Sequence, residues 1–193
     1  LAEQFGLAIV PPRPALVPLA LPPETLTTLA PISGVSFEAE AALAERSDAQ
    51  SALDQARFRE KVLVTHRGLS GPAILQISSY WQMQEYGRAS GPKRDVTIDL
   101  FPGTDAAAWR AQRARSRALL ANLLAEKLPH SFARGWCALH GWDKPMAEFD
   151  AAARERIAAT LNGWAIAPSG TLGFSKAEVT LGGVDTDGLS SKT

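Results

Sequence analysis

Four short segments of the chain carry the residue pattern of β-strands. Apolar and polar residues alternate along residues 35–40, 96–100 and 177–181, which predicts strands with one buried face, and residues 62–65 form an apolar, β-branched run. Residues 10–23 contain six prolines, so we expect an extended stretch there with an edge strand around residues 15–19, because proline donates no backbone hydrogen bond. Together these segments predict one sheet or barrel.

Helical periodicity interrupts the strands. A helix is predicted from Gly71 to about Trp81, because Pro72 suits a first helical turn and Ser70 can cap it. From Thr104 onward leucines recur on one helical face until Pro129 stops the helix. After residue 145 a continuous apolar stripe predicts a bundle-type helix, formed by Phe149, Ala153, Ile157, Leu161 and Trp164. Residues 82–95 are predicted to be a loop by their turn chemistry.

The predicted class is therefore α+β. We expect a mostly antiparallel β domain built from residues 1–103 and 165–193, with a small helical subdomain inserted at residues 104–164. The chain begins at Leu1 rather than Met and ends after a polar run, so we expect a segment excised from a longer protein.

Composition narrows the function classes. Hydrophobic residues make up 46% and charged residues 21% of the 193 residues, which is typical of a packed domain. Lys plus Arg and Asp plus Glu number 20 each, so we expect neither a nucleic-acid nor a membrane partner. The single cysteine, Cys137, excludes an intrachain disulfide, and no signal peptide or long apolar run is present, so we expect a cytoplasmic protein.

Familiar cofactor motifs are missing from the sequence. Neither G-x-G-x-x-G nor G-x-x-x-x-G-K-[ST] occurs, which argues against a self-contained nucleotide site. The three histidines, His66, His130 and His140, lack the spacing of a metal site, so no metal is expected.

Two glycine-bearing segments are the best candidates for a binding role. Residues 65–72 combine a strand end, a glycine-hinged turn and a helix start, where backbone N–H groups can face an anion beside His66 and Ser70. Residues 170–184 include Gly182-Gly183, which let a backbone approach a flat ligand closely. The structural alternatives are a capped strand-to-helix turn and an ordinary turn or bulge.

Two further groups favour structural roles. The five tryptophans are assigned to core packing rather than to stacking on a ligand. The basic cluster of Arg110, Arg113, Arg115 and Arg117 falls on a helix, and a solvated face is favoured over a nucleic-acid patch.

Three segments, in order, resemble one protein family. Residues 58–76 (FREKVLVTHRGLSGPAILQ), the proline-rich residues 10–19 and residues 176–193 are similar to the BaiN-type family of bacterial NAD(P)/FAD-dependent oxidoreductases, and the resemblance covers essentially the whole chain. It implies that the chain is the insert between two halves of an FAD-binding domain that lies outside it. It also implies a barrel of the reductase and elongation-factor type with a small helical domain set into it.

The resemblance further implies the partners and cofactors. The intact protein is expected to use FAD, reduced by NAD(P)H, and to act on a small-molecule substrate, while the fragment alone holds no cofactor and is not catalytic. The residues expected to face the flavin and substrate are His66, Gly68, Ser70, Gly71, Thr180, Gly182 and Gly183. No catalytic residue is identified. Two alternatives stay open: a non-catalytic binding or interaction module, and a nucleic-acid-binding barrel, which the zero net charge disfavours.

Overall fold

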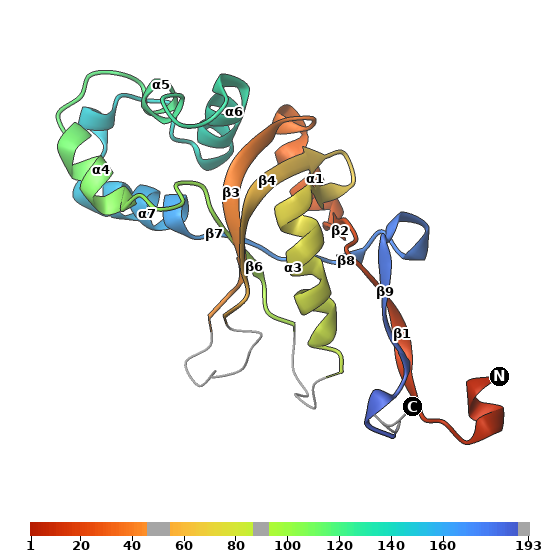
Figure 1. Cartoon of the computed structure of the whole chain (residues 1–193). Helices are drawn as coiled ribbons and strands as arrows, with labels where there is room; N and C mark the ends of the chain where they lie inside the picture. The colour runs from red at the N-terminus through yellow and green to blue at the C-terminus, as the bar shows by residue number, and fades with distance from the viewer. Residues whose placement is uncertain (46–54, 87–92, 189–193) are drawn as a thin grey trace.

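The computed structural model describes residues 1–45, 55–86 and 93–188. Three parts are visible in Figure 1: a central sheet with one long helix against it, a group of helices beyond one edge of the sheet, and a two-stranded ribbon on the opposite side.

The central sheet has seven antiparallel strands in the order β7-β6-β3-β4-β5-β2-β8. Their bounds in this order are Trp164–Ile166, Val96–Asp99, Ser36–Leu43, Arg57–Thr65, Gly68–Ser70, Leu19–Ala20 and Gly170–Thr171. The two edge strands, β7 and β8, are separated by only three residues, 167–169, which span about 10 Å at most. The sheet must therefore curl toward closure, although no ladder joins β7 to β8 in the described part of the chain.

The predicted α+β class with antiparallel strands is confirmed, whereas the barrel does not close. Strand alternation accounts for the buried face of the sheet, since Phe37 and Ala39 of β3 and Val62 and Val64 of β4 are buried. Helix α3 (Pro72–Met83) covers that face. The expected cap of this helix is wrong, because Ser70 belongs to β5 and Gly71 takes the N-cap position with no side-chain cap.

The helical group contains four helices with short breaks between them. They are α4 (Ala106–Arg113), α5 (Leu120–Leu124), α6 (His130–His140) and α7 (Ala151–Asn162). Asp105 caps α4 by accepting from the amides of Ala107 and Ala108, and Asp150 caps α7 by accepting from the amide of Ala153. Helix α6 ends at His140, and Gly141 takes the C-cap position in the left-handed region, with a φ of 66°.

The helix predicted from Thr104 to Pro129 is in fact two helices. The residues between α4 and α5 form hydrogen bonds with the segment that follows α6. The Met146 amide donates to the Ala118 carbonyl at 3.1 Å, and the Ala147 amide donates to the Ser116 carbonyl at 2.9 Å. These long-range hydrogen bonds replace the helical ones. Two helices were not predicted, α6 and α1 (Pro23–Leu29), while the predicted apolar stripe of α7 is buried at Ala153, Ile157 and Leu161.

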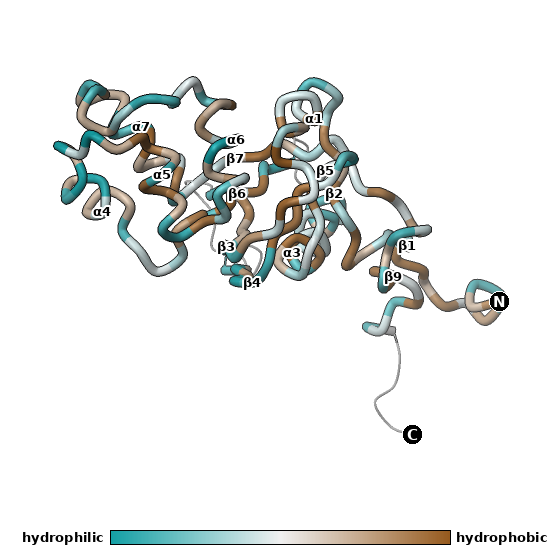
Figure 2. Tube along the Cα trace, turned by 90° about the horizontal axis from the view of Figure 1, so that it is seen from above, coloured by the Kyte–Doolittle hydropathy of each residue, from teal (hydrophilic) through white to brown (hydrophobic). Residues whose placement is uncertain are grey.

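One continuous apolar core runs through the sheet and the helices. Phe37 of β3 and Phe132 of α6 meet with their ring centroids 4.1 Å apart, and Phe132 also lies 6.1 Å from Trp164 of β7. Figure 2 shows the hydrophobic residues concentrated in the centre, where α3 lies against the sheet. The division into a β domain and a separate helical subdomain at residues 104 and 164 stays a prediction.

The ribbon pairs β1 (Ile9–Ala15) antiparallel to β9 (Val179–Val184). Its register shifts between Val10 and Arg13, at the two prolines that cannot donate to a ladder. The edge strand expected around residues 15–19 is therefore displaced: β1 ends at Ala15, and β2 begins at Leu19 in the other sheet. No helix in the described ranges is long and apolar enough to cross a membrane.

Candidate functional site

The first predicted site segment lies at the β4–β5 turn and the start of α3. His66 is exposed in the turn, and Gly68 is the β5 residue paired with Thr65 and Ala20. A Cβ on Gly68 would lie 2.0 Å from the Leu19 carbonyl oxygen, and one on Gly71 would lie 2.6 Å from the Lys61 carbonyl oxygen. Both glycines are thus required by close approach of the chain's own backbone.

The second predicted segment lies on the ribbon, in the other sheet. Thr180 is exposed and pairs with Pro14. Gly182 has a φ of 80°, and a Cβ there would lie 2.6 Å from the Pro11 carbonyl oxygen, so this glycine serves the bulge opposite the prolines. Gly183 has a φ of 108° and open space around its Cβ position. The two segments belong to different sheets, and their role beside a flavin stays a prediction.

These contacts test how well the chain could hold a flavin. Three of the four predicted glycines, Gly68, Gly71 and Gly182, already have backbone atoms where a ligand would need to approach. Only Gly183 among the four keeps its α-carbon open. These segments do not form a flavin cradle by themselves, and their positions open to a ligand are His66 in the exposed turn and Gly183 on the ribbon.

Polar side chains at the end of α3 hold the ribbon against the body. Arg13 of β1 and Lys93 both form ion pairs with Glu85, and the Tyr86 hydroxyl donates to the Pro11 carbonyl at 2.6 Å. Lys93 also lies over the Trp81 ring, 3.6 Å from its centroid. Burial, with the Arg13 charge nearby, outweighs the Glu85 counterion and lowers the pKa of Lys93 to about 8.

The ribbon and its flanks expose several large apolar side chains. Those with at least a third of their surface exposed in this region are Leu1, Phe5, Phe174, Val179 and Val184. They lie on the side of the molecule opposite the helices (Figure 1). Apolar side chains gathered in this way are typical of a surface that packs against another domain.

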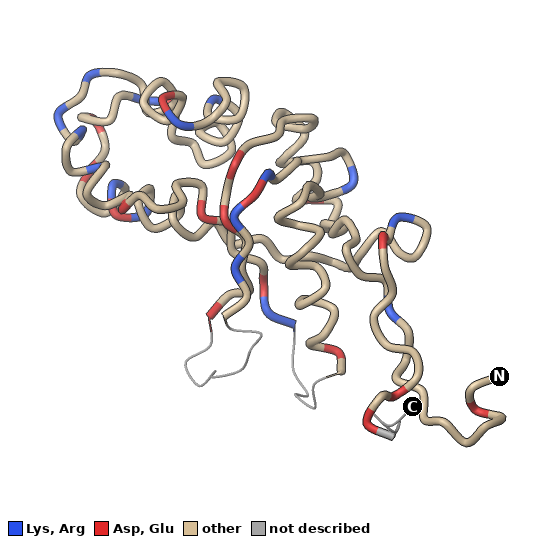
Figure 3. Tube along the Cα trace, in the orientation of Figure 1, with Lys and Arg blue, Asp and Glu red and all other residues tan. Residues whose placement is uncertain are grey.

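The basic cluster of α4 divides into two kinds of arginine. Arg110 donates to Glu155 of α7 at 2.6 Å, and Arg113 donates to Glu126 at 2.7 Å while lying over the Trp109 ring. Arg115 and Arg117, in the segment after α4, are exposed and form no ion pair with any residue that the structure describes. Figure 3 shows positive residues along the outer edge of this helical group.

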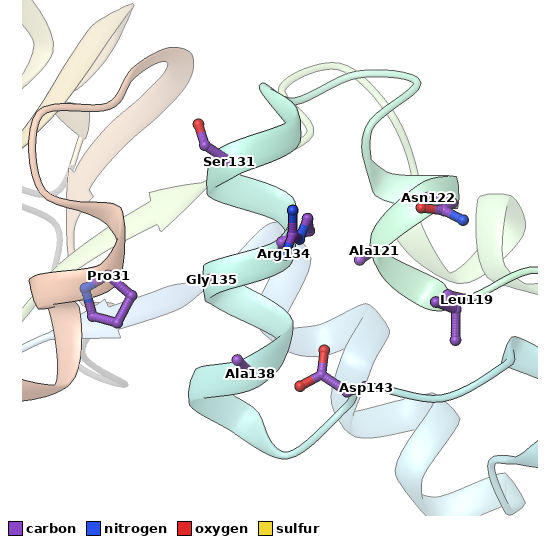
Figure 4. Close-up of a pocket in the computed structure, with 9 residues that line it drawn as sticks. All are labelled: Pro31, Leu119, Ala121, Asn122, Ser131, Arg134, Gly135, Ala138 and Asp143. Carbon is purple, nitrogen blue, oxygen red and sulfur yellow. The ribbon is translucent and has the colours of Figure 1, made fainter.

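A groove of about 780 Å³ lies on the surface between α5 and α6. Its wall on α6 consists of Ser131, Arg134, Gly135 and Ala138, which recur at helical spacing on the face opposite the buried Phe132 and Trp136. Figure 4 shows Arg134 between Ser131 and Asp143, with Asn122 of α5 on one side and Pro31 on the other. The groove thus combines a guanidinium, an amide, a hydroxyl and a carboxylate.

Sequence reasoning missed this groove. Helix α6 begins directly after Pro129, and its face at Ser131, Arg134 and Ala138 carries no sequence motif. A helical plot of residues 130–140 would have separated the polar face from the buried one. Only the fold, however, brings Asn122 and Asp143 to the same place.

Two other titratable groups of the helices, Cys137 and His140, are fully and partly buried, respectively. Burial, together with the Asp143 carboxylate, raises the pKa of the Cys137 thiol to about 12, so it is neither a nucleophile nor a proton donor at neutral pH. Burial lowers the pKa of His140, whose ring stacks on Trp142 with centroids 4.5 Å apart. In the described ranges, no three His, Cys, Asp or Glu residues are grouped so that they could hold a metal ion.

Comparison with known proteins assigns the chain to a family. A family model described as "HI0933-like protein barrel and H2TH domain" matches residues 13–179. The chain belongs to this family. The match confirms the resemblance inferred from the sequence at the level of the family, and its description agrees with a curled sheet joined to a helical group.

Two curated relatives are similar over the whole chain. The ribosomal RNA dihydrouridine synthase of Escherichia coli (strain K12) is 38% identical over 196 residues, and that of Haemophilus influenzae (strain ATCC 51907 / DSM 11121 / KW20 / Rd) is 35% identical over 197 residues. The alignments cover 100% of this chain and 44% of each relative. The chain therefore spans less than half the length of these relatives.

These relatives correct one prediction. The expectation that the protein has no nucleic-acid partner is wrong, because both relatives are named for a reaction on ribosomal RNA. The physical error was to argue from net charge. A zero sum says nothing about where the charges lie, and RNA meets only a local surface.

Proposed function

We propose that the intact protein is a flavin-dependent enzyme that reduces uridine in ribosomal RNA to dihydrouridine, and that this chain is its insert domain. The observation that carries the proposal is the similarity to two ribosomal RNA dihydrouridine synthases, which extends over 100% of this chain. The chain would not be catalytic alone, because its thiol is buried and its predicted site segments lie apart in two sheets.

The geometry of the ribbon supports the role of an insert. Strands β1 and β9, from the two ends of the chain, pair side by side, so the polypeptide could leave a neighbouring domain and return to it through one connector. The exposed apolar side chains on and beside the ribbon would pack against that domain. We propose that this neighbour is the FAD-binding domain, formed in two halves on either side of the insert.

The reaction defines what each part must supply. Dihydrouridine differs from uridine by two hydrogens across the C5–C6 bond, so a hydride and a proton must be added. Bound FAD, once reduced by NAD(P)H, would supply the hydride. This chain would orient the RNA and cover the flavin, with His66, Thr180 and Gly183 as the predicted site residues whose surroundings are open to a ligand.

The test uses the intact protein. It should purify with flavin absorbance, oxidise NAD(P)H, and form dihydrouridine in protein-free ribosomal RNA, detected by mass spectrometry of the digested nucleosides. In an Escherichia coli strain lacking the relative, its expression should restore dihydrouridine in ribosomal RNA, while an empty vector should not. A flavin-loaded protein that oxidises NAD(P)H but leaves ribosomal RNA unmodified would refute the RNA substrate. A protein without flavin would favour the alternative, a non-catalytic interaction module.

A further inference from the structure

The charges of the chain are unevenly distributed along its sequence. Residues 104–164 contain nine Lys and Arg against six Asp and Glu, and the remaining residues contain eleven against fourteen. The neutral total therefore conceals a helical segment with a net charge of about +3 and a β portion of about −3 at neutral pH. A partner made of phosphates would be attracted to the helices and repelled by the rest.

Several Lys and Arg side chains of the helical segment already contact other residues of this chain. Arg110 and Arg113 form the ion pairs described above, Lys127 donates to Thr104 at 3.3 Å, and Lys144 lies over the Phe149 ring. These side chains hold helices together.

Four arginines of this segment are exposed and form no side-chain ion pair or hydrogen bond with the residues that the structure describes: Arg115, Arg117, Arg134 and Arg156. Arg156 belongs to α7 and does not line the groove. Exposed guanidiniums without counterions contribute little to the stability of the fold and are available to an anionic partner.

Three of these four arginines lie in the groove or on the segment that leads to one of its walls: Arg115, Arg117 and Arg134. Arg134 is in the groove between α5 and α6, and Leu119 forms part of the wall of the same groove. Arg117 precedes Leu119 by two residues, so its Cα lies within about 7 Å of that wall. Asn122 and Ser131 add an amide and a hydroxyl beside Arg134 (Figure 4), and neither side chain is engaged by another described residue.

We propose that Arg115, Arg117 and Arg134 form the surface by which this chain binds the phosphate backbone of its RNA, with Arg134 receiving one phosphate in the α5–α6 groove. The planar guanidinium would donate two hydrogen bonds to the phosphate oxygens, and Asn122 and Ser131 would each donate one more. This inference rests on the proposed function, which makes RNA the substrate.

Asp143 sets the position of the phosphate within the groove. Its carboxylate lies beyond Arg134 in the direction of Ala138 (Figure 4), and like charge repels a phosphate there. The phosphate is therefore confined to the part of the groove away from Asp143, toward Ser131. Such contacts carry no sequence information and fix the RNA in place, while the base to be reduced would be selected elsewhere.

The experiment measures binding of the intact protein to protein-free ribosomal RNA by fluorescence anisotropy over a range of KCl concentrations. Arg134→Gln and the double variant Arg115→Gln/Arg117→Gln are each expected to weaken binding about 10-fold and to reduce the slope of log K against log salt by about 0.7 to 1 per arginine. Arg134→Lys should fall between wild type and Arg134→Gln, because it keeps the charge and loses the planar fork. Asp143→Asn should tighten binding.

The matched control is Lys61→Gln, which removes one exposed, unpaired cation from β4 and should leave binding unchanged. Flavin absorbance and the melting temperature of each variant check that it is folded and loaded. In turnover the arginine variants should raise KM for RNA and leave kcat unaltered.

The outcomes separate the two proposals. If wild type reduces ribosomal RNA and the arginine variants bind it as tightly as wild type, the arginines form only a solvated face and this surface is wrong. A loss of binding seen on assembled ribosomal subunits but not on protein-free RNA would assign the arginines to a ribosomal protein and also overturn it. If wild type neither binds nor reduces ribosomal RNA, the proposed function fails as well.

Discussion

The side-chain amide of Asn162 donates a hydrogen bond to the Asp99 carboxylate, with Nδ2 and Oδ1 2.8 Å apart. Asp99 ends β6, where the chain enters the helices, and Asn162 ends α7, where it leaves them. Asn162 also donates to the Thr104 carbonyl and accepts from the Ala106 amide. One amide therefore joins the entry and the exit of the helical segment.

Replacing this amide by a carboxylate should open the junction. Asn162→Asp removes both donated hydrogen bonds and places two carboxylates side by side, so we expect unfolding by urea to show a loss of about 1–2 kcal/mol. Adding Asp99→Asn should recover most of that loss, because the new amide at position 99 relieves the repulsion. Equal stability of Asn162→Asp and wild type would contradict the role of this pair.

Gly135 allows α6 to approach the 3-10 helix Ala30–Ile32 closely. A Cβ at position 135 would lie 2.2 Å from Cγ2 of Ile32, so one of the two helices must shift. Gly135→Ala should cost about 1–3 kcal/mol despite the better helix propensity of alanine. The double variant Ile32→Ala/Gly135→Ala should be more stable than the sum of the two single losses predicts, because Ile32→Ala removes the clashing methyl group. Additive losses in urea unfolding would rule out this clash.

Gly182 and Gly183 form a matched pair for separating structure from flavin contact. Both have positive φ, but only Gly182 has backbone carbonyls at its Cβ position. Gly182→Ala should therefore speed hydrogen exchange in β1 and β9 much more than Gly183→Ala does.

The same pair tests the predicted flavin-facing role in the intact protein. Gly183→Ala and Gly183→Leu share the backbone strain of a side chain at a φ of 108°, so they differ mainly in bulk. If the ribbon faces the flavin, Gly183→Leu should have lower flavin occupancy or turnover than Gly183→Ala. Unchanged flavin content and rates in a folded Gly183→Leu protein would remove the ribbon from the cofactor site.

Cys137 should be chemically silent in the native protein. Its thiol is fully buried and its pKa is raised to about 12, so almost none is thiolate near pH 8. Iodoacetamide at that pH should leave the native chain unmodified for hours and modify it once urea unfolds it, with mass spectrometry as the measurement. Stoichiometric labelling of native protein within minutes would show that the core around α6 opens.

His140 should make the protein less stable in acid. Burial lowers its pKa in the folded state, so below its ordinary value of 6.5 the unfolded chain binds a proton that the native chain does not. The free energy of unfolding should fall as the pH drops below about 6.5. His140→Phe keeps an aromatic ring beside Trp136 and Trp142 and should flatten this dependence, measured by urea unfolding at about pH 7.5 and pH 5. If the free energy of unfolding of His140→Phe fell as much between about pH 7.5 and pH 5 as that of wild type, another group would be responsible for the acid sensitivity.

The local pattern of apolar and polar residues predicted those helices and strands that bury one face. The alternation at residues 35–40 and 96–100 marks β3 and β6, and the apolar stripe at Ala153, Ile157 and Leu161 marks α7. Burial of one face imposes a period on each of these segments, and that period is visible without a structure.

Only the tertiary structure decided the features made by distant segments. The break between α4 and α5 arises because residues 116 and 118 bond to residues 147 and 146. The groove is lined by residues of α5 and α6 and by Asp143, which are apart in the sequence. Gly68, Gly71 and Gly182 of the predicted site lie against carbonyl groups of the chain itself. The sequence by itself determined the class, the family resemblance and four of the nine strands in the described residues, β3, β4, β6 and β9. Which arginines form ion pairs and which do not was decided by packing, because an ion pair depends on two side chains that only the fold brings within reach.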